Sequence, residues 1–367
     1  MERFGLVGLP NSGKTSLFNA LSGGKALAAH YPFATRETNV GIGRVPDPRL
    51  DALAEMSRSK QVVPAVVEFV DIGGLAAGAS RGEGLGNRFL AGIREVDAIV
   101  FVLRAFEDED VAGTADPVED LAVLETELAL ADLQAVEGHI LKRRKAAKSD
   151  RAAADEVAAL EAALAVLAEG VPVYRSSLSA GQRETLRPWF LLTNKPVLVV
   201  VNVGEDQLGD LDPVVKPVAE AMEAEAAGAG AGAGADVLAI SVQLEAEATQ
   251  LPEPERAEML EGLGLGEGAL PRLVRAAYHL LGRRTFLTTG EKESRAWTFR
   301  AGAKAPECAG VIHSDLQRGF IRAEVIRWDE LVPLGSWNAA RDTGKLRVEG
   351  KDYEVQDGDV LEIRFNV

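Results

Sequence analysis

The feature that most constrains this chain is a glycine-rich octapeptide near its start. It reads Gly-Leu-Pro-Asn-Ser-Gly-Lys-Thr from Gly8 to Thr15, after the apolar stretch Arg3–Val7 and before a helical pattern that starts near Thr15. The order strand, loop, helix with G-x-x-x-x-G-K-[ST] spacing is the Walker A pattern, whose backbone N–H groups surround a β-phosphate. The pattern predicts an α/β fold, a P-loop nucleoside triphosphatase (NTPase).

The residue types of this loop predict individual roles. Lys14 would span the β- and γ-phosphates, the Thr15 hydroxyl would ligate Mg²⁺, and the N-terminus of the following helix adds a favourable dipole. The alternative is a glycine-rich turn that arises by chance, and the flanking strand and helix favour the functional interpretation. The residues that we expect to contact the nucleotide here are Asn11, Ser12, Gly13, Lys14, Thr15 and Ser16.

A second motif lies at the end of the apolar run Val66–Val70, which continues as Asp-Ile-Gly-Gly from Asp71 to Gly74. A carboxylate at the end of a strand beside a P-loop can hold Mg²⁺ through water, and a following glycine N–H can sense the γ-phosphate. We therefore expect Lys14, Asp71 and Gly74 to be the catalytic groups. Thr35 stands between the two motifs, where a mobile threonine would complete the Mg²⁺ shell; the alternative is an ordinary loop threonine.

Apolar runs rich in β-branched residues alternate with helical segments through the first two thirds of the chain. This alternation predicts a mostly parallel, doubly wound sheet, a G domain of the P-loop class. Between the third and fourth runs, two Ala/Leu/Glu-rich segments at 117–141 and 155–167 predict an inserted α-helical arm with a charged turn at 142–151. The expected strands are Arg3–Val7, Val66–Val70, Ala98–Leu103, Val197–Val201 and Val237–Ile240.

The last quarter of the chain has a different pattern, with short strands separated by short helices. The expected strands are Arg295–Phe299, Phe320–Ile326, Lys345–Val348 and Leu361–Phe365, which together indicate a small α+β domain. The alternating Ala/Gly stretch 227–235 has no side chain able to pack, so we expect a flexible surface loop. The expected domains are a discontinuous nucleotide-binding domain at 1–116 and 191–282, a helical insert at 117–190 and a C-terminal domain at 283–367.

Charge and cysteine content narrow the classes of partner and compartment. The tail from Arg283 carries 14 basic and 14 acidic residues, so the whole formal charge of −16 lies in the first 282 residues. An acidic body argues against non-specific nucleic-acid binding, so we expect no DNA partner. No signal peptide or run long enough to span a bilayer is found, and the single Cys308 fits a reducing compartment. We expect a cytoplasmic protein without a membrane partner.

One local exception to the acidic body is the turn of the predicted arm. It holds six cations within ten residues: Lys142, Arg143, Arg144, Lys145, Lys148 and Arg151. A patch of this density could contact RNA phosphates. The alternative is a solvated helix turn, and the sequence leaves both open.

Several stretches spread over nearly the whole chain resemble the YchF-type Obg-like ATPases. They are Tyr31–Thr35, Val45–Arg49, Gly82–Asn87, Glu291–Thr298, Ala309–Asp315, Gly319–Glu324 and Glu349–Asp359. The resemblance implies a G domain, a helical insert and a C-terminal TGS domain of ubiquitin-like β-grasp form. It also implies a cytosolic ATPase linked to stress responses and to ribosomes, with the large subunit and its rRNA as the expected partner.

The base-recognition segment differs from that of GTPases, which use Asn-Lys-x-Asp after the fifth strand so that the carboxylate accepts from guanine N1–H and the 2-amino group. Adenine has neither donor. This chain has Asn202, Val203, Gly204 and Glu205 there, and the family it resembles carries Asn-x-x-Glu and prefers ATP. We expect ATP and ADP as ligands, with GTP weaker, bound by Asn202, Val203, Glu205 and Ser241. The alternatives are a GTPase of the same fold and a nucleotide-gated ribosome-binding module whose turnover is incidental.

The group that orients the attacking water is not evident. Leu75 stands where Ras-like proteins keep a glutamine, so we expect slow intrinsic hydrolysis. In the family a histidine after the fourth strand is implicated, but the corresponding loop 106–114 has none, and His313 is expected to be structural. In K⁺-activated relatives the residue equivalent to Asn11 ligates K⁺, so the cofactors would be Mg²⁺ and K⁺; the alternative is a turn-forming asparagine.

Overall fold

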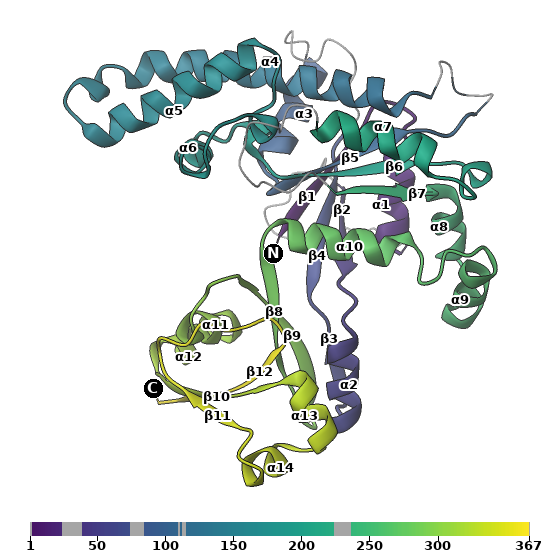
Figure 1. The fold of residues 1–367 in the computed structure, drawn as a ribbon, viewed down its shortest axis with the longest axis vertical. Helices are drawn as coiled ribbons and strands as arrows, with labels where there is room; N and C mark the ends of the chain where they lie inside the picture. The colour runs from purple at the N-terminus through teal and green to yellow at the C-terminus, as the bar shows by residue number, and fades with distance from the viewer. Residues whose placement is uncertain are drawn as a thin grey trace. The chain divides into compact units, whose positions relative to one another are not determined.

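Two six-stranded sheets organise the chain (Figure 1). The structure is a computed structural model that describes residues 2–23, 39–73, 84–108, 111, 115–223 and 236–366, without the side chains of 84–88. The chain separates into a first unit, residues 1–43 and 68–276, and a second unit, residues 44–67 and 277–367. Each sheet belongs mainly to one unit.

The sheet of the first unit has the strand order β2-β4-β1-β5-β6-β7. β1 pairs in parallel with β4 and β5, and β6 pairs in parallel with β5 and β7. The central strands β5 and β6 are apolar up to their last residues, Arg104 and Asn202, because helices cover both faces of such a sheet, and every residue of the two strands is buried. The strands are β1 Arg3–Val7, β2 Asn39–Arg44, β4 Val66–Asp71, β5 Ala98–Arg104, β6 Val197–Asn202 and β7 Val237–Ile240.

The helices of the first unit connect these strands and bury apolar side chains against them. Their shared core includes Phe101, Leu124 and Val199, which are all fully buried. Because the P-loop joins β1 to the first helix, this core holds the loop at the carboxyl edge of the sheet. The helices are α1 Lys14–Leu21, α3 Gly84–Arg94, α7 Asp212–Glu223, α8 Val242–Ala248, α9 Glu253–Gly262 and α10 Ala269–Leu280, whose last turn lies in the second unit.

The helical arm consists of α4 Pro117–Arg143 and α5 Arg151–Ala168, with the short helix α6 Ala180–Leu186 packed beside α5 (Figure 1). Asp116 caps α4 by accepting from the N–H groups of Val118 and Glu119, and Pro117 occupies the first turn. The turn between the long helices contains a 3₁₀ segment, Ala146–Lys148. The arm has its own apolar core, which includes Ile140 and Leu160.

The second unit is built on a mixed sheet of order β11-β10-β12-β8-β9-β3. β12 runs parallel to β8 and antiparallel to β10, and α11 packs against β9 and β10, which is the strand-and-helix arrangement of a β-grasp domain. Its strands are β3 Gln61–Val63, β8 Arg283–Thr288, β9 Glu293–Arg300, β10 Phe320–Arg327, β11 Arg347–Glu349 and β12 Asp359–Phe365. Its helices are α2 Pro48–Ser57, α11 Ala305–Ile312, α12 Ser314–Arg318, α13 Trp328–Leu334 and α14 Trp337–Asp342.

The expected α/β fold class with an inserted helical arm and a C-terminal β-grasp domain is confirmed. The strands expected in the first sheet all form, with bounds that differ by at most one residue. The strands β2, β3 and β8 were not expected, because each is short or interrupted by glycine or charge. The Ala/Gly stretch 227–235 lies outside the described residues. Within the described ranges, no helix has the length and apolarity that a membrane crossing requires.

The division into units differs from the expected domain boundaries in two respects. Residues 44–67, expected within the nucleotide-binding domain, cluster with the second unit, because β3 pairs with β9. The helical insert 117–190 does not separate from the first unit, because α4 packs against both β5 and α7. Neither packing is visible in the local sequence pattern.

Candidate nucleotide-binding site

The loop between β1 and α1 has the backbone that a phosphate-binding turn requires. Asn11 and Gly13 both have positive φ, 65° and 86°. Gly13 ends the loop in left-handed conformation and its carbonyl accepts from Leu17 N at 2.9 Å, which starts α1. A Cβ on Gly8 would lie 2.6 Å from the carbonyl oxygen of Val102, so only glycine fits between the loop and β5.

Three side chains with phosphate and metal chemistry meet at the start of α1. Lys14 Nζ donates to Asp71 Oδ1, and Thr15 Oγ1 donates to Asp71 Oδ2 at 3.1 Å. The ion pair is largely buried, since both side chains are 9% exposed. β1 and β4 are neighbouring parallel strands, so the end of β4 lies beside the P-loop. The structure thus brings together Lys14, Thr15 and Asp71, three of the residues that the sequence predicted to contact the phosphates and the ion.

Asn202, the last residue of β6, ties the P-loop to the rest of the sheet. Its Nδ2 donates to the carbonyl of Ser12 at 3.0 Å, and its Oδ1 accepts from Val242 N at 3.1 Å. The side chain is buried, and a Cβ on Gly13 would overlap its Nδ2. Nδ2 carries two N–H groups, so one remains for a purine base after the bond to Ser12.

The other expected base contacts have different surroundings. The Val203 side chain is buried in the apolar core and its N–H donates to Ile240 O at 3.0 Å, so neither is directed to a ligand. Glu205 is exposed in the 3₁₀ segment Glu205–Gln207, which starts three residues after the end of β6 at Asn202. Ser241 is buried at the start of α8, beside the segment that Asn202 holds.

The residues present fit a nucleotide with a bound divalent ion. Ser12 Oγ is buried in this loop and has no hydrogen-bond partner among the described residues. Thr15 and Asp71 offer the oxygen ligands that Mg²⁺ prefers. The described part of the chain contains no cluster of three or more His, Cys, Asp or Glu side chains suited to a metal. Mg²⁺ held mainly by substrate phosphates and water needs no such cluster.

Some expected residues are not placed in the site. Thr35, Gly74 and Leu75 lie outside the described residues. Ser16 is exposed on the first turn of α1. His313 Nδ1 accepts from Asp315 N at 3.1 Å and so caps α12 in the second unit, a structural role.

The dipeptide Asn194-Lys195, which imitates part of the GTPase motif, has structural contacts only. The Asn194 amide exchanges hydrogen bonds with Arg183. Lys195 Nζ donates to the carbonyls of Arg94 and Val96 at the end of α3, and burial lowers its pKa. Both side chains are therefore bonded to other residues of the first unit.

A buried arginine beside the site was not predicted from the sequence. Arg104 ends β5 in register with Asn202, and its Nε donates to Phe106 O at 3.0 Å. Its guanidinium lies 5.3 Å from the centre of the Phe106 ring. The available signal was a charged residue that ends an otherwise apolar strand, a position where side chains of a parallel sheet face its ligand edge.

Comparison with known proteins identifies the family. A model of the YchF GTPase C-terminal region, described as a protein of unknown function, matches residues 284–366, and a model of the 50S ribosome-binding GTPases matches residues 3–130. The "Ribosome-binding ATPase YchF" of Haemophilus ducreyi is 47% identical, with 99% of each chain covered, and that of Bacillus subtilis is 45% identical with the same coverage.

A solved structure matches over the same extent. The structure of the YchF GTPase of Schizosaccharomyces pombe superimposes with a TM-score of 0.84 and 34% identity, covering 99% of this chain and 97% of that one. Both the sequence and the fold are therefore shared from end to end, including the strand, loop and helix that form the phosphate site. On this basis the chain belongs to the YchF family.

Proposed function

We propose that this protein binds ATP with Mg²⁺ at the P-loop, hydrolyses it to ADP and phosphate, and binds the ribosome in a nucleotide-dependent manner. The observation that carries the proposal is the contact of Lys14 and Thr15 with Asp71, in a loop that Asn202 holds in place. The relatives named as ribosome-binding ATPases support the choice of reaction and partner.

Nucleotide binding would replace the Lys14–Asp71 pair. A buried charge that loses its partner destabilises the fold strongly, so a ligand must satisfy both groups at once. A triphosphate with Mg²⁺ would satisfy both groups: the phosphates would form an ion pair with the Lys14 ammonium, and the Asp71 carboxylate would accept hydrogen bonds from water bound to the ion. Thr15, and Asp71 through water, would hold the Mg²⁺, whose charge would offset the negative charge that develops on the phosphates during transfer. Thr15 would be a direct ligand.

Further contacts of the reacting phosphate are proposed on sequence grounds. Thr35 would add a second hydroxyl ligand to Mg²⁺, and the Gly74 N–H would bond the γ-phosphate. Asn11 would ligate K⁺ beside the phosphates; its positive φ of 65° is equally suited to a turn-forming asparagine. Ser12, Gly13 and Ser16 would complete the phosphate contacts.

The nature of the base follows from the segment after β6. We assign adenine over guanine because Glu205 begins a 3₁₀ turn and is exposed, so it does not present the short, fixed carboxylate that reads guanine N1–H and the 2-amino group. Asn202 would donate its remaining N–H to the purine. Ser241 directly follows Ile240, which pairs with Asn202, and would border the base.

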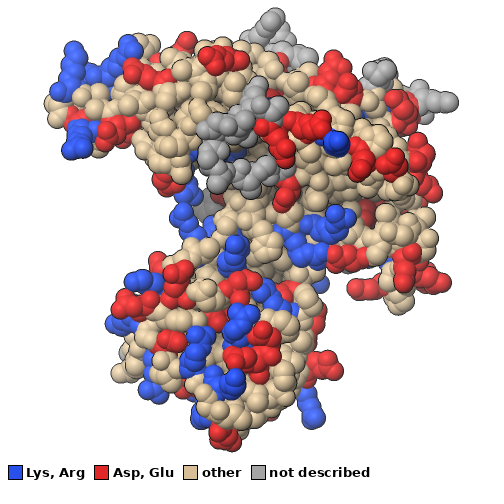
Figure 2. Space-filling view, viewed as in Figure 1, with Lys and Arg blue, Asp and Glu red and all other residues tan. Residues whose placement is uncertain are grey.

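The exposed end of the arm supplies a surface for ribosomal RNA. Figure 2 shows basic side chains gathered at the far end of the arm, on a body that is otherwise rich in acidic groups. Two of the six cations pair with α5, Arg143 with Glu156 and Arg144 with Glu161. The other four have no carboxylate partner among the described residues, and Leu141 beside them is 73% exposed. This cationic surface is suited to bind the phosphates of ribosomal RNA.

We expect the change of Lys142, Lys145 and Lys148 together to glutamine to weaken ribosome binding in a salt-dependent way. The plot of log affinity against log salt concentration has a negative slope, and each lost phosphate contact should make it shallower by about 0.7–0.9, so by roughly 2–3 in total. Sedimentation of the protein with ribosomes at several salt concentrations measures the slope. Lys216→Gln is the control, because Lys216 is exposed on α7 in an i,i+4 pair with Glu220. An unchanged slope would show that the arm tip is a solvated helix turn that does not contact ribosomal RNA.

Single-turnover hydrolysis of ATP with and without ribosomes tests the reaction itself. We expect slow turnover by the protein alone, since no water-orienting glutamine stands after the Asp-Ile-Gly-Gly motif, and a faster rate with ribosomes. A rate that ribosomes leave unchanged would favour the alternative of a binding module whose turnover is incidental.

The same assay tests K⁺. If Asn11 is a ligand, hydrolysis should be faster in K⁺ than in Na⁺ at equal ionic strength, and Asn11→Gly, which keeps the positive φ, should remove the difference. Equal rates in both salts would leave Asn11 as a turn residue.

Because ribosome binding requires the compartment that contains ribosomes, we assign this protein to the cytoplasm. Burial raises the pKa of the single Cys308 thiol to about 12, so the thiol stays protonated and unreactive there.

A further inference from the structure

Residues 44–67 belong to the second unit but interrupt the first. They follow β2 and lead into β4, two neighbouring strands of the first sheet, and the boundary between units falls within both strands. β4 ends at Asp71, the residue that contacts Lys14 and Thr15. One continuous strand therefore starts in the second unit and ends in the nucleotide site.

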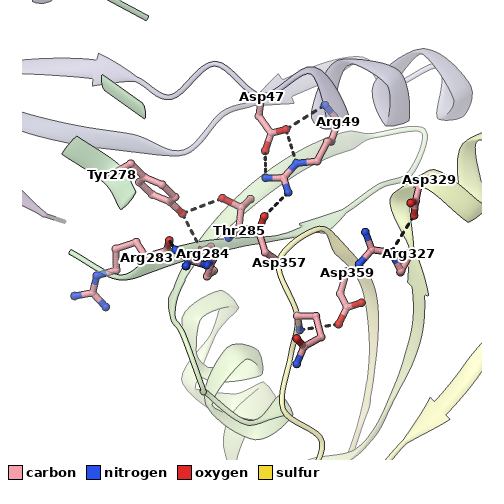
Figure 3. Close-up of polar contacts among 11 residues, drawn as sticks. Asp47, Arg49, Tyr278, Arg283, Arg284, Thr285, Arg327, Asp329, Asp357 and Asp359 are labelled. Atoms are coloured by element: carbon pink, nitrogen blue, oxygen red, sulfur yellow. Dashed lines mark hydrogen bonds and ion pairs between the residues drawn. The ribbon is translucent and has the colours of Figure 1, made fainter. Parts of the chain in front are cut away.

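An arginine at the start of α2 fastens this segment to the β-grasp sheet (Figure 3). Arg49 donates to both carboxylate oxygens of Asp47, each at 2.8 Å, and to Asp357 Oδ2 at 2.6 Å. Asp357 Oδ1 accepts from Thr285 N on β8 at 2.8 Å. The two carboxylates raise the pKa of the Arg49 guanidinium, with the Asp47 hydrogen bond as the largest cause. We call Asp47, Arg49 and Asp357 the arginine joint.

A glycine beside the arginine joint leaves room for the Arg49 guanidinium. Gly358 has a φ of 84°, and a Cβ there would lie 3.2 Å from Arg49 Nη1 and 3.0 Å from Trp328 Cδ1. Gly358 N donates to Thr285 O at 2.8 Å, so Asp357 and Gly358 are both hydrogen-bonded to Thr285 of β8. Only glycine lets the guanidinium approach this closely without displacement.

A second attachment holds the other end of the segment. β3 pairs in parallel with β9 from Gln61 to Val63. Ahead of it, Ser59 Oγ donates to Gly290 O at 2.8 Å and shares a hydrogen bond with the buried Ser294 hydroxyl. Residues 44–67 are thus bonded near one end to the turn before β12, through Arg49 and Asp357, and near the other end to β9 and the β8–β9 turn.

We propose that the arginine joint couples the nucleotide state of the P-loop to the second unit through β4. The motifs Asp47-Pro48-Arg49 and Asp357-Gly358-Asp359 do not contribute to the phosphate site. Phosphate binding therefore does not explain why the arginine joint is so closely packed, and coupling between the units would explain it. Exchange of the Lys14–Asp71 pair for a Mg²⁺–nucleotide changes the partners at the end of β4. A strand fixed at its other end transmits that change to whatever it is fastened to.

The inference rests on the proposed function, because it takes ATP and ADP as the ligands and the ribosome as the partner whose affinity reports the coupling. Two sites coupled in this way change each other's affinity by the same factor, typically about 5–150-fold. The ratio of ribosome affinities of the ATP-loaded and ADP-loaded protein is therefore the quantity that the joint controls.

The test uses the full chain with Asp357→Asn and, separately, Arg49→Lys. Asparagine keeps an oxygen to accept from Thr285 N but loses the charge that faces Arg49, whereas lysine keeps the charge and loses the fork that binds both oxygens of Asp47. Asp329→Asn is the matched control, because Arg327 and Asp329 form an exposed ion pair of the same unit outside the joint (Figure 3). A non-hydrolysable ATP analogue and ADP are the ligands.

We expect a ratio of about fivefold or more for the wild type and the control, and a ratio near one for both joint variants, whose nucleotide affinities without ribosomes should stay within about twofold of wild type. Hydrogen exchange of the β8–β9 hairpin should respond to ATP in the wild type and not in the variants. Joint variants that keep the wild-type ratio, or a wild-type ratio of one, would overturn the coupling. A wild type that binds only GTP would contradict the proposed function, and the same ratio measured with GTP and GDP would still decide the coupling.

Discussion

Replacing Lys14 by alanine should lower the rate of ATP hydrolysis by about 10²–10³-fold, the usual cost of removing one charged or donor group from a phosphoryl or oxyanion site. Among the described residues, Lys14 is the one lysine or arginine that forms an ion pair with Asp71, so we expect no other side chain to replace its charge at the β- and γ-phosphates. Affinity for the triphosphate should fall more than affinity for the diphosphate. Single-turnover hydrolysis and equilibrium binding measure the two effects.

Loss of Lys14 also leaves the Asp71 carboxylate without its cation, so stability must be separated from chemistry. Lys195→Ala is the matched control, because Lys195 is likewise partly buried and bonded, through the carbonyls of Arg94 and Val96, but lies outside the site. It should lower the thermal midpoint and leave the hydrolysis rate per folded molecule unchanged. Near-normal turnover in Lys14→Ala would refute the assignment of the P-loop.

Gly13→Ala should nearly abolish nucleotide binding. The φ of 86° is unfavourable for alanine by about 1–2 kcal/mol, and the added methyl group would overlap Nδ2 of Asn202, which holds the loop through Ser12 O. Relief of the overlap must move either the loop or Asn202. We expect the affinity for ATP to fall by at least about tenfold, or 1.4 kcal/mol. Isothermal titration measures it.

Gly170→Ala separates backbone strain from the overlap. Gly170 has a φ of 83° and no described atom within 4 Å of an added Cβ. This variant should lose stability by about the same 1–2 kcal/mol of backbone strain and keep its affinity for ATP. Equal loss of affinity in the two variants would show that the contact between Gly13 and Asn202 is not what shapes the loop.

Local patterns were sufficient to predict most of the first sheet and the phosphate loop. Apolar runs such as Val197–Val201 are buried on both faces, and the P-loop spacing follows from the glycines that its backbone needs. The same local information also predicted that Lys14 and Asp71 would act together, because the ends of adjacent parallel strands meet at one edge of a sheet.

Contacts between residues far apart in the chain were not predictable in this way. Arg49 meets Asp357 across 308 positions, and β3 has no strand signal of its own apart from its pairing with β9. The role of Asn202 in the P-loop depends on where β6 lies in the sheet. The predicted ligand contact of Val203 was wrong. Its place in the base-recognition motif suggested that contact, but its side chain is buried in the core. A lysine at this position, as in the GTPase motif, would place a charge in that core.

The most direct test of the account is the set of affinities of the wild-type protein for ATP, ADP, GTP and GDP, measured by competition in the presence of Mg²⁺. Glu205 is exposed in a 3₁₀ turn and does not present the carboxylate that recognises guanine. We predict that ATP binds at least about tenfold more tightly than GTP, a difference of 1.4 kcal/mol. GTP binding that is tenfold or more tighter than ATP binding would contradict the account and make the protein a GTPase of the same fold.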